Sequence, residues 1–355
     1  MALRFAHDTL GQRLLFGSGL AARHVADEVA RLGASRIMLI AAVFEQEIAE
    51  VVTANITLTV TYNDVVQHVP IAKAEDARRV AAENTIDLLI SVGGGSTTGL
   101  AKAIALTTGI PIIAVATTYA GSEATNVWGL TEEARKTTGV DARVLPVTVV
   151  YDPELTYSLP VELSVASGMN ALAHCVDSMW APRADPINQA LAAEGIRALA
   201  AGLPLVAQNP TDEKGREQAL YGAYLSAVAF ASAGSGMHHK ICHVLGGTYN
   251  LPHAQTHATV LPYVLAFNAP FAPDADARIA GAFGATSGLE GLNELRRVLD
   301  APRALKDYGF TEANIPEAVS IVLPLIPADN PRPATTENLT ELLHAAWAGS
   351  TPQAH

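Results

Sequence analysis

The chain has little cysteine, few aromatic residues and few basic residues. Its 355 residues include two cysteines, Cys175 and Cys242, which are too few for a disulfide framework. Both lie in apolar patterns, which predicts buried, reduced thiols. Aromatic residues make up only 6% of a chain that is 49% hydrophobic, so aliphatic side chains must fill most of the interior of a globular protein.

Positive charge is also scarce, with 23 Lys and Arg against 35 Asp and Glu and a formal net charge of −12. Binding to nucleic acid relies on clustered basic residues, so the composition argues against a nucleic-acid partner. No run of 18 or more uncharged apolar residues occurs, so we expect no membrane span. The N-terminal residues MALRFAHDTLGQ lack the apolar stretch of a signal peptide, which favours a cytoplasmic location.

Up to about residue 150 the sequence alternates between strand and helix patterns. Such βαβ alternation predicts a parallel sheet with right-handed crossovers, hence an α/β domain. The expected strands are Arg13–Gly17, Arg36–Ala42, Ile56–Tyr62, Leu88–Val92 and Ile110–Ala116. The expected helices are His24–Leu32, Lys73–Asn84 and Gly99–Thr108.

Beyond a turn-rich linker at Asp152–Pro160 the pattern changes to long segments rich in alanine and leucine, which predict an all-helical domain. The expected helices are Ser164–Trp180, Ile187–Ala207, Asp212–Ser232, His238–Leu245, Thr256–Phe267, Asp274–Phe283, Leu289–Leu299 and Ile315–Leu325. We therefore expect two domains, 1–159 and 160–355, with the cleft between them as the default ligand site.

Three glycines follow an expected strand directly and precede an expected helix. In SVGGGSTTGLAKAIAL, Gly93, Gly94 and Gly95 let backbone N–H groups approach a phosphate, and the helix N-terminus adds a favourable dipole. Ser96 and Thr97 can cap the helix or donate to phosphate oxygens. The segment is neither G-x-G-x-x-G nor a Walker A motif, and a tight strand-to-helix turn without a ligand is the alternative.

A second polar loop is expected at Ala116–Gly139 (ATTYAGSEATNVWGLTEEARKTTG), which follows the next strand and therefore opens at the same edge of the sheet. Its hydroxyls at Thr117, Thr118, Ser122 and Thr125 are candidates to hold a ribose or a nicotinamide amide. A loop rich in Thr and Ser is by itself more often only a loop. Two polar loops on neighbouring strand ends favour a dinucleotide site.

Five of the 11 histidines lie in one short stretch of the second domain, as His238, His239, His243, His253 and His257. His239 and His243 are four residues apart, as are Asn170 and His174 upstream, so each pair lies on one face of a helix. This density and spacing indicate a cage for a divalent metal more than isolated core histidines.

The order of these motifs resembles the iron-containing alcohol dehydrogenase family over essentially the whole chain. The shared elements are strand–GGGS–helix, TT..GSE.T, GMNALAH and HxxxHxxGxxYNxPH. The resemblance implies a Rossmann-like N-terminal domain, a helical C-terminal domain, bound NAD(P), and a metal held by one Asp and three His. The Asp position is occupied by Asn170, and the His positions by His174, His239 and His253. His243 matches a non-ligand histidine near the nicotinamide.

Asn170, together with TTYAGSEAT, KTTGVD, VLPVTVVYDPELT and SGMNALAH, resembles one branch of that family, the maleylacetate reductases. This branch implies reduction of the C=C bond of maleylacetate to 3-oxoadipate with NADH or NADPH, in bacterial degradation of aromatic compounds, by a homodimer that uses no metal. An amide supplies a dipole where a carboxylate would neutralise a cation. We therefore expect no metal, although three histidines and an amide can still bind zinc.

The resemblance also implies roles for individual residues. Donors to the enolate oxygen are expected among His239, His243, His253 and Asn170, with the proton coming from His243 or His253. His238 and His257 lie outside the motif positions and are expected to be uninvolved. His174 is also a catalytic candidate, and Tyr119 and Trp128 are candidates to line the pocket. Lys136 is a candidate to bind the coenzyme. Candidates to bind the substrate carboxylates are Lys136, Lys240, Arg143 and the helix N-terminus near His253.

The first Rossmann strand ends in Leu39-Ile40-Ala41-Ala42-Val43, without a carboxylate to repel a 2′-phosphate, so we expect NADPH to serve as well as NADH. Two alternatives to the reductase remain. One is a metal-dependent alcohol or polyol dehydrogenase that tolerates Asn170. The other is a dinucleotide-binding sensor without catalysis, against which the histidine cluster argues.

Overall fold

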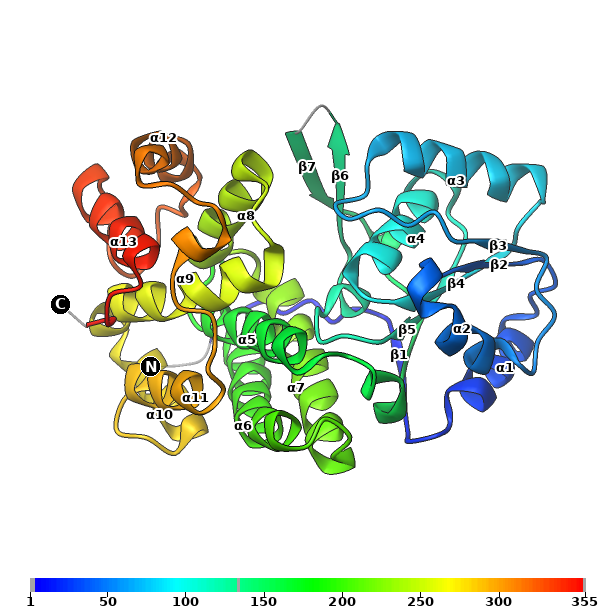
Figure 1. Ribbon diagram of the computed structural model, residues 1–355, viewed down its shortest axis with the longest axis horizontal. Coiled ribbons are helices and arrows are strands. Elements are labelled where there is room, and N and C mark those ends of the chain that lie inside the picture. The colour runs from blue at the N-terminus through cyan, green and yellow to red at the C-terminus, as the bar shows by residue number, and fades with distance from the viewer. Residues whose placement is uncertain (1–3, 133–134, 354–355) are drawn as a thin grey trace. The chain divides into compact units, whose positions relative to one another are not determined.

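The computed structural model describes residues 4–132 and 135–353, without the side chains of residues 135 and 136, and divides into two compact units (Figure 1). One unit is Leu10–Leu159 and the other runs from Pro160 onward. Residues 4–9 group with the second unit, not with the first as we expected. His7 explains this, because its Nδ1 lies 2.8 Å from Asp185 Oδ2 and 3.2 Å from Ser232 Oγ.

The first unit is built on six parallel strands in the order β1–β8–β5–β4–β2–β3. The strands are β1 (Arg13–Phe16), β2 (Ile37–Ile40), β3 (Val60–Tyr62), β4 (Leu88–Gly93), β5 (Ile112–Ala116) and β8 (Thr148–Tyr151). The helices are α1 (Ala21–Leu32), α2 (Gln46–Thr53), α3 (Ile71–Glu83) and α4 (Gly95–Thr108). The parallel α/β domain predicted from the sequence is confirmed.

Helices cover both faces of this sheet, which explains the uninterrupted apolar strands. Met38 and Ile40 pack with α3 and α4, whereas Ile37 and Leu39 pack with α1 and α2 (Figure 1). All four side chains are at most 4% exposed. A polar residue at any of these positions would be buried, so β2 shows no alternation of apolar and polar residues.

The strand order reverses direction between β2 and β4. From β2 the chain continues outward to β3, while β4 leads to β5 and then β8 on the other side. In open parallel sheets, ligands bind at the carboxyl ends of the strands where the order reverses. For this unit that point lies beyond Ile40 of β2 and Gly93 of β4.

One helix and three strands of this unit were not predicted from the sequence. They are α2, β8 and the antiparallel hairpin of β6 (Val127–Glu132) and β7 (Arg135–Val140). The hairpin was expected to be a loop because its residues are polar and include glycines. Gly139 has a structural reason, since a Cβ there would lie 2.7 Å from the ring of Trp128, its partner across the hairpin.

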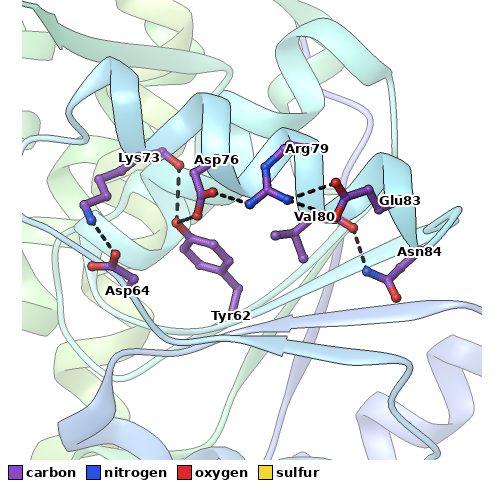
Figure 2. Close-up of polar contacts among 8 residues, drawn as sticks. All are labelled: Tyr62, Asp64, Lys73, Asp76, Arg79, Val80, Glu83 and Asn84. Carbon is purple, nitrogen blue, oxygen red and sulfur yellow. Dashed lines mark hydrogen bonds and ion pairs between the residues drawn. The ribbon is translucent and has the colours of Figure 1, made fainter.

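A polar network joins the edge strand β3 to helix α3 (Figure 2). The buried Tyr62 donates its hydroxyl to Asp76 Oδ2 at 3.0 Å, and Arg79 binds Asp76 at 2.6 Å. Lys73 pairs with Asp64 just beyond the strand. Burial and the neighbouring Asp76 raise the pKa of Tyr62, so the hydroxyl remains a donor. These contacts fix a strand of only three residues at the end of the sheet.

The second unit is helical throughout its described residues from 160 to 353, which confirms the prediction. Its helices are α5 (Val161–Ser178), α6 (Pro186–Gln208), α7 (Glu213–Ala233), α8 (Met237–Tyr249), α9 (His253–Asn268), α10 (Pro273–Phe283), α11 (Gly288–Val298), α12 (Ile315–Val322) and α13 (Thr336–Ala348). Helix α5 packs against α6, α7 and α9, and a second core joins α8, α9, α12 and α13. Helix α13 was missed, although the capping box of Thr335 and Asn338 marks its start.

Helix α6 is the one described helix that is long and apolar enough to cross a membrane. Its 18-residue window has a mean hydropathy of 1.5, and 44% of that window is buried. The helix packs against α5, α7 and α10. Core helices of globular proteins meet the same length and composition criteria, so α6 alone is weak evidence of a membrane span.

Candidate active site

The turn between β4 and α4 requires glycine because three chain segments meet there. Gly93 has φ +150°, and a Cβ on it would lie 2.2 Å from Glu45 Oε2. A Cβ on Gly94 would lie 3.0 Å from Thr118 Cγ2. Helix α4 then begins at Gly95 and runs 14 residues. The turn therefore brings a helix N-terminus and bare backbone to the point where the strand order reverses.

Glu45 stabilises this turn by hydrogen bonds with Thr97 and Thr117, a role that was not predicted from the sequence. It is 6% exposed and accepts hydrogen bonds from Thr117 Oγ1 at 2.9 Å and Thr97 Oγ1 at 3.3 Å. Burial raises the pKa of Glu45, while the two hydroxyl donors lower it. The hydroxyls of Thr97 and Thr117, assigned from the sequence to the coenzyme, thus donate to Glu45 inside the protein. A carboxylate does follow β2, but it faces inward.

Lys102 fixes the second polar loop in the same way. The side chain is 1% exposed and its ammonium donates to the carbonyls of Ser122, Thr125 and Val127 at 2.6, 2.8 and 2.8 Å. It also lies 3.1 Å from Thr125 Oγ1. Burial lowers the pKa of Lys102 to about 7. The Thr125 hydroxyl therefore takes part in the loop's own hydrogen bonds, and its contact with the coenzyme stays a prediction.

The other candidates in the first unit have varied surroundings. Tyr119 is fully buried, whereas Thr118 and Ser96 are only partly buried near the glycine turn. Arg143 is bound by Asp141 at 2.7 Å, so its charge is already paired. The side chain of Lys136 lies outside the described part of the structure.

The helical unit brings the histidines together. The rings of His174 and His239 stack at 5.0 Å, and His239 lies 5.9 Å from His243. The rings of His253 and His257 are 4.4 Å apart on α9. We call His174, His238, His239, His243, His253 and His257 the histidine cluster.

His238 and His257 lie within this cluster, although they stand outside the motif positions of the sequence. Both are 0% exposed, and His238 Nε2 lies 2.9 Å from His257 Nδ1. The ring of His257 contacts His239 at 5.0 Å and His243 at 6.4 Å. Neither residue can serve as a remote control in mutagenesis.

Asp177 lies behind His239 and was not identified from the sequence. Its side chain is 0% exposed, and Oδ2 accepts from His239 Nδ1 at 2.7 Å and from the backbone N–H of Gly236 at 2.8 Å. It thereby caps the start of α8. Burial raises the pKa of Asp177 to about 7 against these donors. The available signal was a carboxylate three residues after His174 on the same helix face.

Several buried polar atoms in this region have no hydrogen-bond partner among the described residues. They include Asn170 Oδ1, His174 Nδ1, His239 Nε2 and His257 Nε2. Buried polar atoms are otherwise almost always paired, so unpaired ones concentrated in one place indicate a ligand. Neutral nitrogen and amide oxygen atoms suit a borderline divalent cation as well as water or a polar substrate.

Burial favours the neutral form of His174, His238 and His239. It lowers the pKa of His174 to about 4 and of His238 to about 3, and lowers the pKa of His239 well below its usual range. Because His239 donates from Nδ1 to Asp177, a neutral ring leaves Nε2 without a proton. In that tautomer His239 Nε2 is an acceptor or a ligand, whereas the donor role expected from the sequence requires the other tautomer and stays a prediction.

Both cysteines are buried and reduced, which confirms the prediction. Cys242 Sγ, His238 Nε2 and His257 Nδ1 form the one group of potential metal ligands in the described residues with atoms within 4.8 Å of one another. The hydrogen bond between the two rings already accounts for this proximity. Burial also raises the pKa of the Cys242 thiol, which disfavours the thiolate that a metal requires.

Comparison with known proteins agrees with these features. Residues 11–153 match the iron-containing alcohol dehydrogenases, and residues 164–347 match the C-terminal part of the Fe-containing alcohol dehydrogenase family. A maleylacetate reductase from Sphingobium indicum is 43% identical over 352 residues, covering 99% of each chain.

Two solved structures are also similar. The iron-containing alcohol dehydrogenase from Corynebacterium glutamicum has a TM-score of 0.97 and 62% identity, covering 99% of this chain and 98% of that one. The maleylacetate reductase from Rhizobium sp. strain MTP-10005 has a TM-score of 0.93 and 38% identity, covering 99% of this chain and 100% of that one.

Proposed function

Because the chain belongs to the iron-containing alcohol dehydrogenase family, whose members are oxidoreductases, we propose that it reduces the C=C bond of maleylacetate to 3-oxoadipate with NADH or NADPH. The observation that carries the proposal is Asn170, which stands where the family resemblance expects an aspartate. It is a buried amide beside the histidine cluster, and its Oδ1 has no hydrogen-bond partner among the described residues. Relatives 43% identical over nearly the full length are named for this reaction.

The first unit supplies the coenzyme site in this proposal. The N-terminus of α4 and the glycine turn provide backbone N–H groups for the pyrophosphate. Glu45 and Lys102 hold the two loops rigid, so the binding surface is formed before the coenzyme arrives. Of the residues expected from the sequence, Gly94, Gly95, Ser96 and Thr118 stay the closest candidates for direct contact.

The helical unit supplies the groups for the chemistry. A hydride from the nicotinamide adds to the alkene carbon β to the ketone, and the electron pair of the C=C bond moves toward the ketone oxygen, giving an enolate. A proton then adds to the α carbon, so one hydride and one proton complete the reduction. His243, His253 and the amide N–H groups of Asn170 are the proposed donors to the oxygen, with His243 or His253 giving the proton.

The family is iron-containing, and this gives no support to the expectation that no metal is used. The donor set fits a divalent cation, which Asn170, His174, His239 and His253 would hold. A bound cation would supply positive charge where the enolate develops. We propose that turnover does not require the cation. Asn170 provides no anionic ligand for it, and the hydrogen-bond donors named above can also stabilise the enolate oxygen. Activity after exhaustive chelation tests this point.

The test of the function is to mix the protein with maleylacetate and NADH and to follow coenzyme oxidation by absorbance. We expect steady oxidation with maleylacetate and none with a simple aldehyde. Oxidation with the aldehyde alone would favour the alternative, an alcohol or polyol dehydrogenase. That alternative is supported by the family name carried by the structure that is 62% identical. Oxidation with neither substrate would favour a dinucleotide-binding sensor.

A homodimeric state and a cytoplasmic location also stay proposals for this chain. Both come from the family resemblance and from the sequence composition. Light scattering of the purified protein tests the first, and fractionation of the producing cells tests the second.

A further inference from the structure

We propose that Asp177 is a positioning residue that turns the Nε2 lone pair of His239 toward the histidine cluster, and that its carboxylate supplies, from behind this ligand, the negative charge that Asn170 lacks. The cluster consequently binds a divalent cation of the zinc type. This inference concerns cation binding alone and does not depend on which substrate is reduced.

The first step is the orientation of His239. Its Nδ1 lies 2.7 Å from Asp177 Oδ2, and an ionised Asp177 can only accept, so Nδ1 carries the proton whenever Asp177 is a carboxylate. In a neutral ring Nε2 then bears a lone pair. That atom is buried and has no partner in the described parts of the chain. A histidine that donates one N–H to a carboxylate and offers the other nitrogen is the usual arrangement of a metal ligand.

The second step is the geometry of α5. Asn170, His174 and Asp177 are four and three residues apart, so all three lie along one face of that helix. His239 contacts two of them, stacking on His174 at 5.0 Å and binding Asp177. Asn170 Oδ1 and His174 Nδ1 are also buried without partners in the described structure. One helix face thus carries two neutral candidate ligands and, one turn away, a carboxylate.

The third step is the charge. The buried carboxylate of Asp177 is held by N–H donors from Gly236 and His239, with the N–H of His238 at 3.4 Å. Among the described residues no Lys or Arg forms an ion pair with this carboxylate, although the charge of Lys240 acts to lower its pKa. A cation on His239 Nε2 would be stabilised through the polarised ring. Carboxylates behind a histidine ligand typically change metal affinity by 10–100-fold.

The experiment is a titration of the metal-free full-length protein with Zn²⁺ against a chromophoric chelator. We expect one site per chain in the wild type and an affinity lower by roughly 10–100-fold in Asp177→Asn, which keeps an acceptor for His239 Nδ1 but removes the charge. Asn170→Asp should bind zinc more tightly than the wild type. The double variant N170D/D177N should bind at least as tightly as the wild type, because the charge has only moved.

Asp185→Asn is the matched control. Asp185 is another buried aspartate of the helical unit that caps a helix, α6, and it belongs to no part of the cluster. We expect its loss to lower stability and to leave zinc affinity unchanged. Zinc affinity equal in Asp177→Asn and the wild type, or absence of zinc binding by the wild type, would overturn the proposal.

A measurement on the wild type covers the case in which Asp177→Asn does not fold. Nitrogen-15 NMR of labelled histidines reports which nitrogen of His239 carries the proton. We expect the Nδ1–H tautomer in the metal-free protein and loss of the free Nε2 signal on adding Zn²⁺. An Nε2–H tautomer would refute the orientation step. None of these readouts depends on turnover, so a failed activity assay with intact zinc binding would overturn the proposed function alone.

Discussion

The two polar regions of the molecule are built in opposite ways. In the α/β unit, the side chains at the strand ends bind one another, as Glu45 does with Thr97 and Thr117 and as Lys102 does with loop carbonyls. In the helical unit, His174, His239 and Asn170 each keep a buried atom without a partner in the described residues. The difference indicates that the first region presents its backbone to a ligand, whereas the second presents its side chains.

The largest effect should come from the side chains of the second region. We expect His243→Ala and His253→Ala each to lower kcat by roughly 10²–10³, the usual cost of removing a donor to a developing oxyanion. The dissociation constant of NADH should change little. Steady-state kinetics and coenzyme titration measure the two quantities.

His344→Ala is the control, because His344 is exposed and binds Glu312 at the surface of the same unit. If His344→Ala lowered kcat as much as His253→Ala did, the assignment of the cluster to the chemistry would be wrong.

The backbone of the glycine turn comes next. Gly93→Ala would place a methyl group 2.2 Å from Glu45 Oε2 at φ +150°. We expect a loss of about 3 kcal/mol in the free energy of unfolding, from backbone strain and overpacking together. Urea denaturation measures it. Gly95→Ala is the matched control, since the nearest atom to its Cβ would be 3.6 Å away. Equal losses in both variants would show that Glu45 does not constrain the turn.

The third prediction concerns Lys102 and pH. Its pKa is lowered by burial to about 7 in the folded chain, against about 10.4 in an unfolded one. Between these values the unfolded state binds more protons, so stability rises with pH, by at most about 1.4 kcal/mol per pH unit from this group. Below pH 7 the buried Lys102 ammonium lowers the free energy of unfolding by its full amount, and above about pH 10.4 this destabilisation has disappeared.

Lys102→Met should remove this part of the pH dependence. Denaturation curves of both proteins between pH 7 and 10 check it, because the other titrating groups are shared. Parallel pH profiles for wild type and variant would show that the carbonyl acceptors, not solvent exclusion, govern the proton on Lys102.

The smallest effect is expected between the two coenzymes. Ala41 and Ala42 follow β2 without a carboxylate at the surface, and Glu45 is turned inward and hydrogen-bonded. We expect kcat/KM for NADH and NADPH to agree within about tenfold, or roughly 1.4 kcal/mol. A thousandfold preference for NADH would mean that Glu45 or another carboxylate meets the 2′ position.

The sequence predicted the frame of both regions better than their internal contacts. Strand and helix periodicity indicated a parallel sheet and a helical domain, because buried strands and amphipathic helices leave clear patterns. The hairpin of β6 and β7 left no clear pattern, since β6 is only half-buried and lies in a segment rich in Thr and interrupted by glycine. Motif resemblance pointed to the histidines on α8 and α9, which the fold brings together.

The residues that organise the sites were missed for a common reason. Glu45, Lys102 and Asp177 act through partners 52, 20 and 62 positions away, such as Thr97, Ser122 and His239. No local spacing reports contacts at such separations. His257 was expected to be uninvolved because it lies outside the motif positions. A motif does not report which other rings the fold places near its residues, and the ring of His257 lies beside that of His239.

The position of the transferred hydride in the product tests most directly whether the chain reduces the C=C bond of maleylacetate. The protein is supplied with maleylacetate and NADH deuterated at the transferred hydrogen, and the product is examined by NMR. If the hydride adds to the C=C bond, we expect 3-oxoadipate with deuterium on the methylene carbon β to the ketone, next to a carboxylate. Deuterium on a carbinol carbon, in a hydroxy acid that keeps its C=C bond, would show that the chain is a carbonyl reductase and would contradict the proposed reduction of the C=C bond.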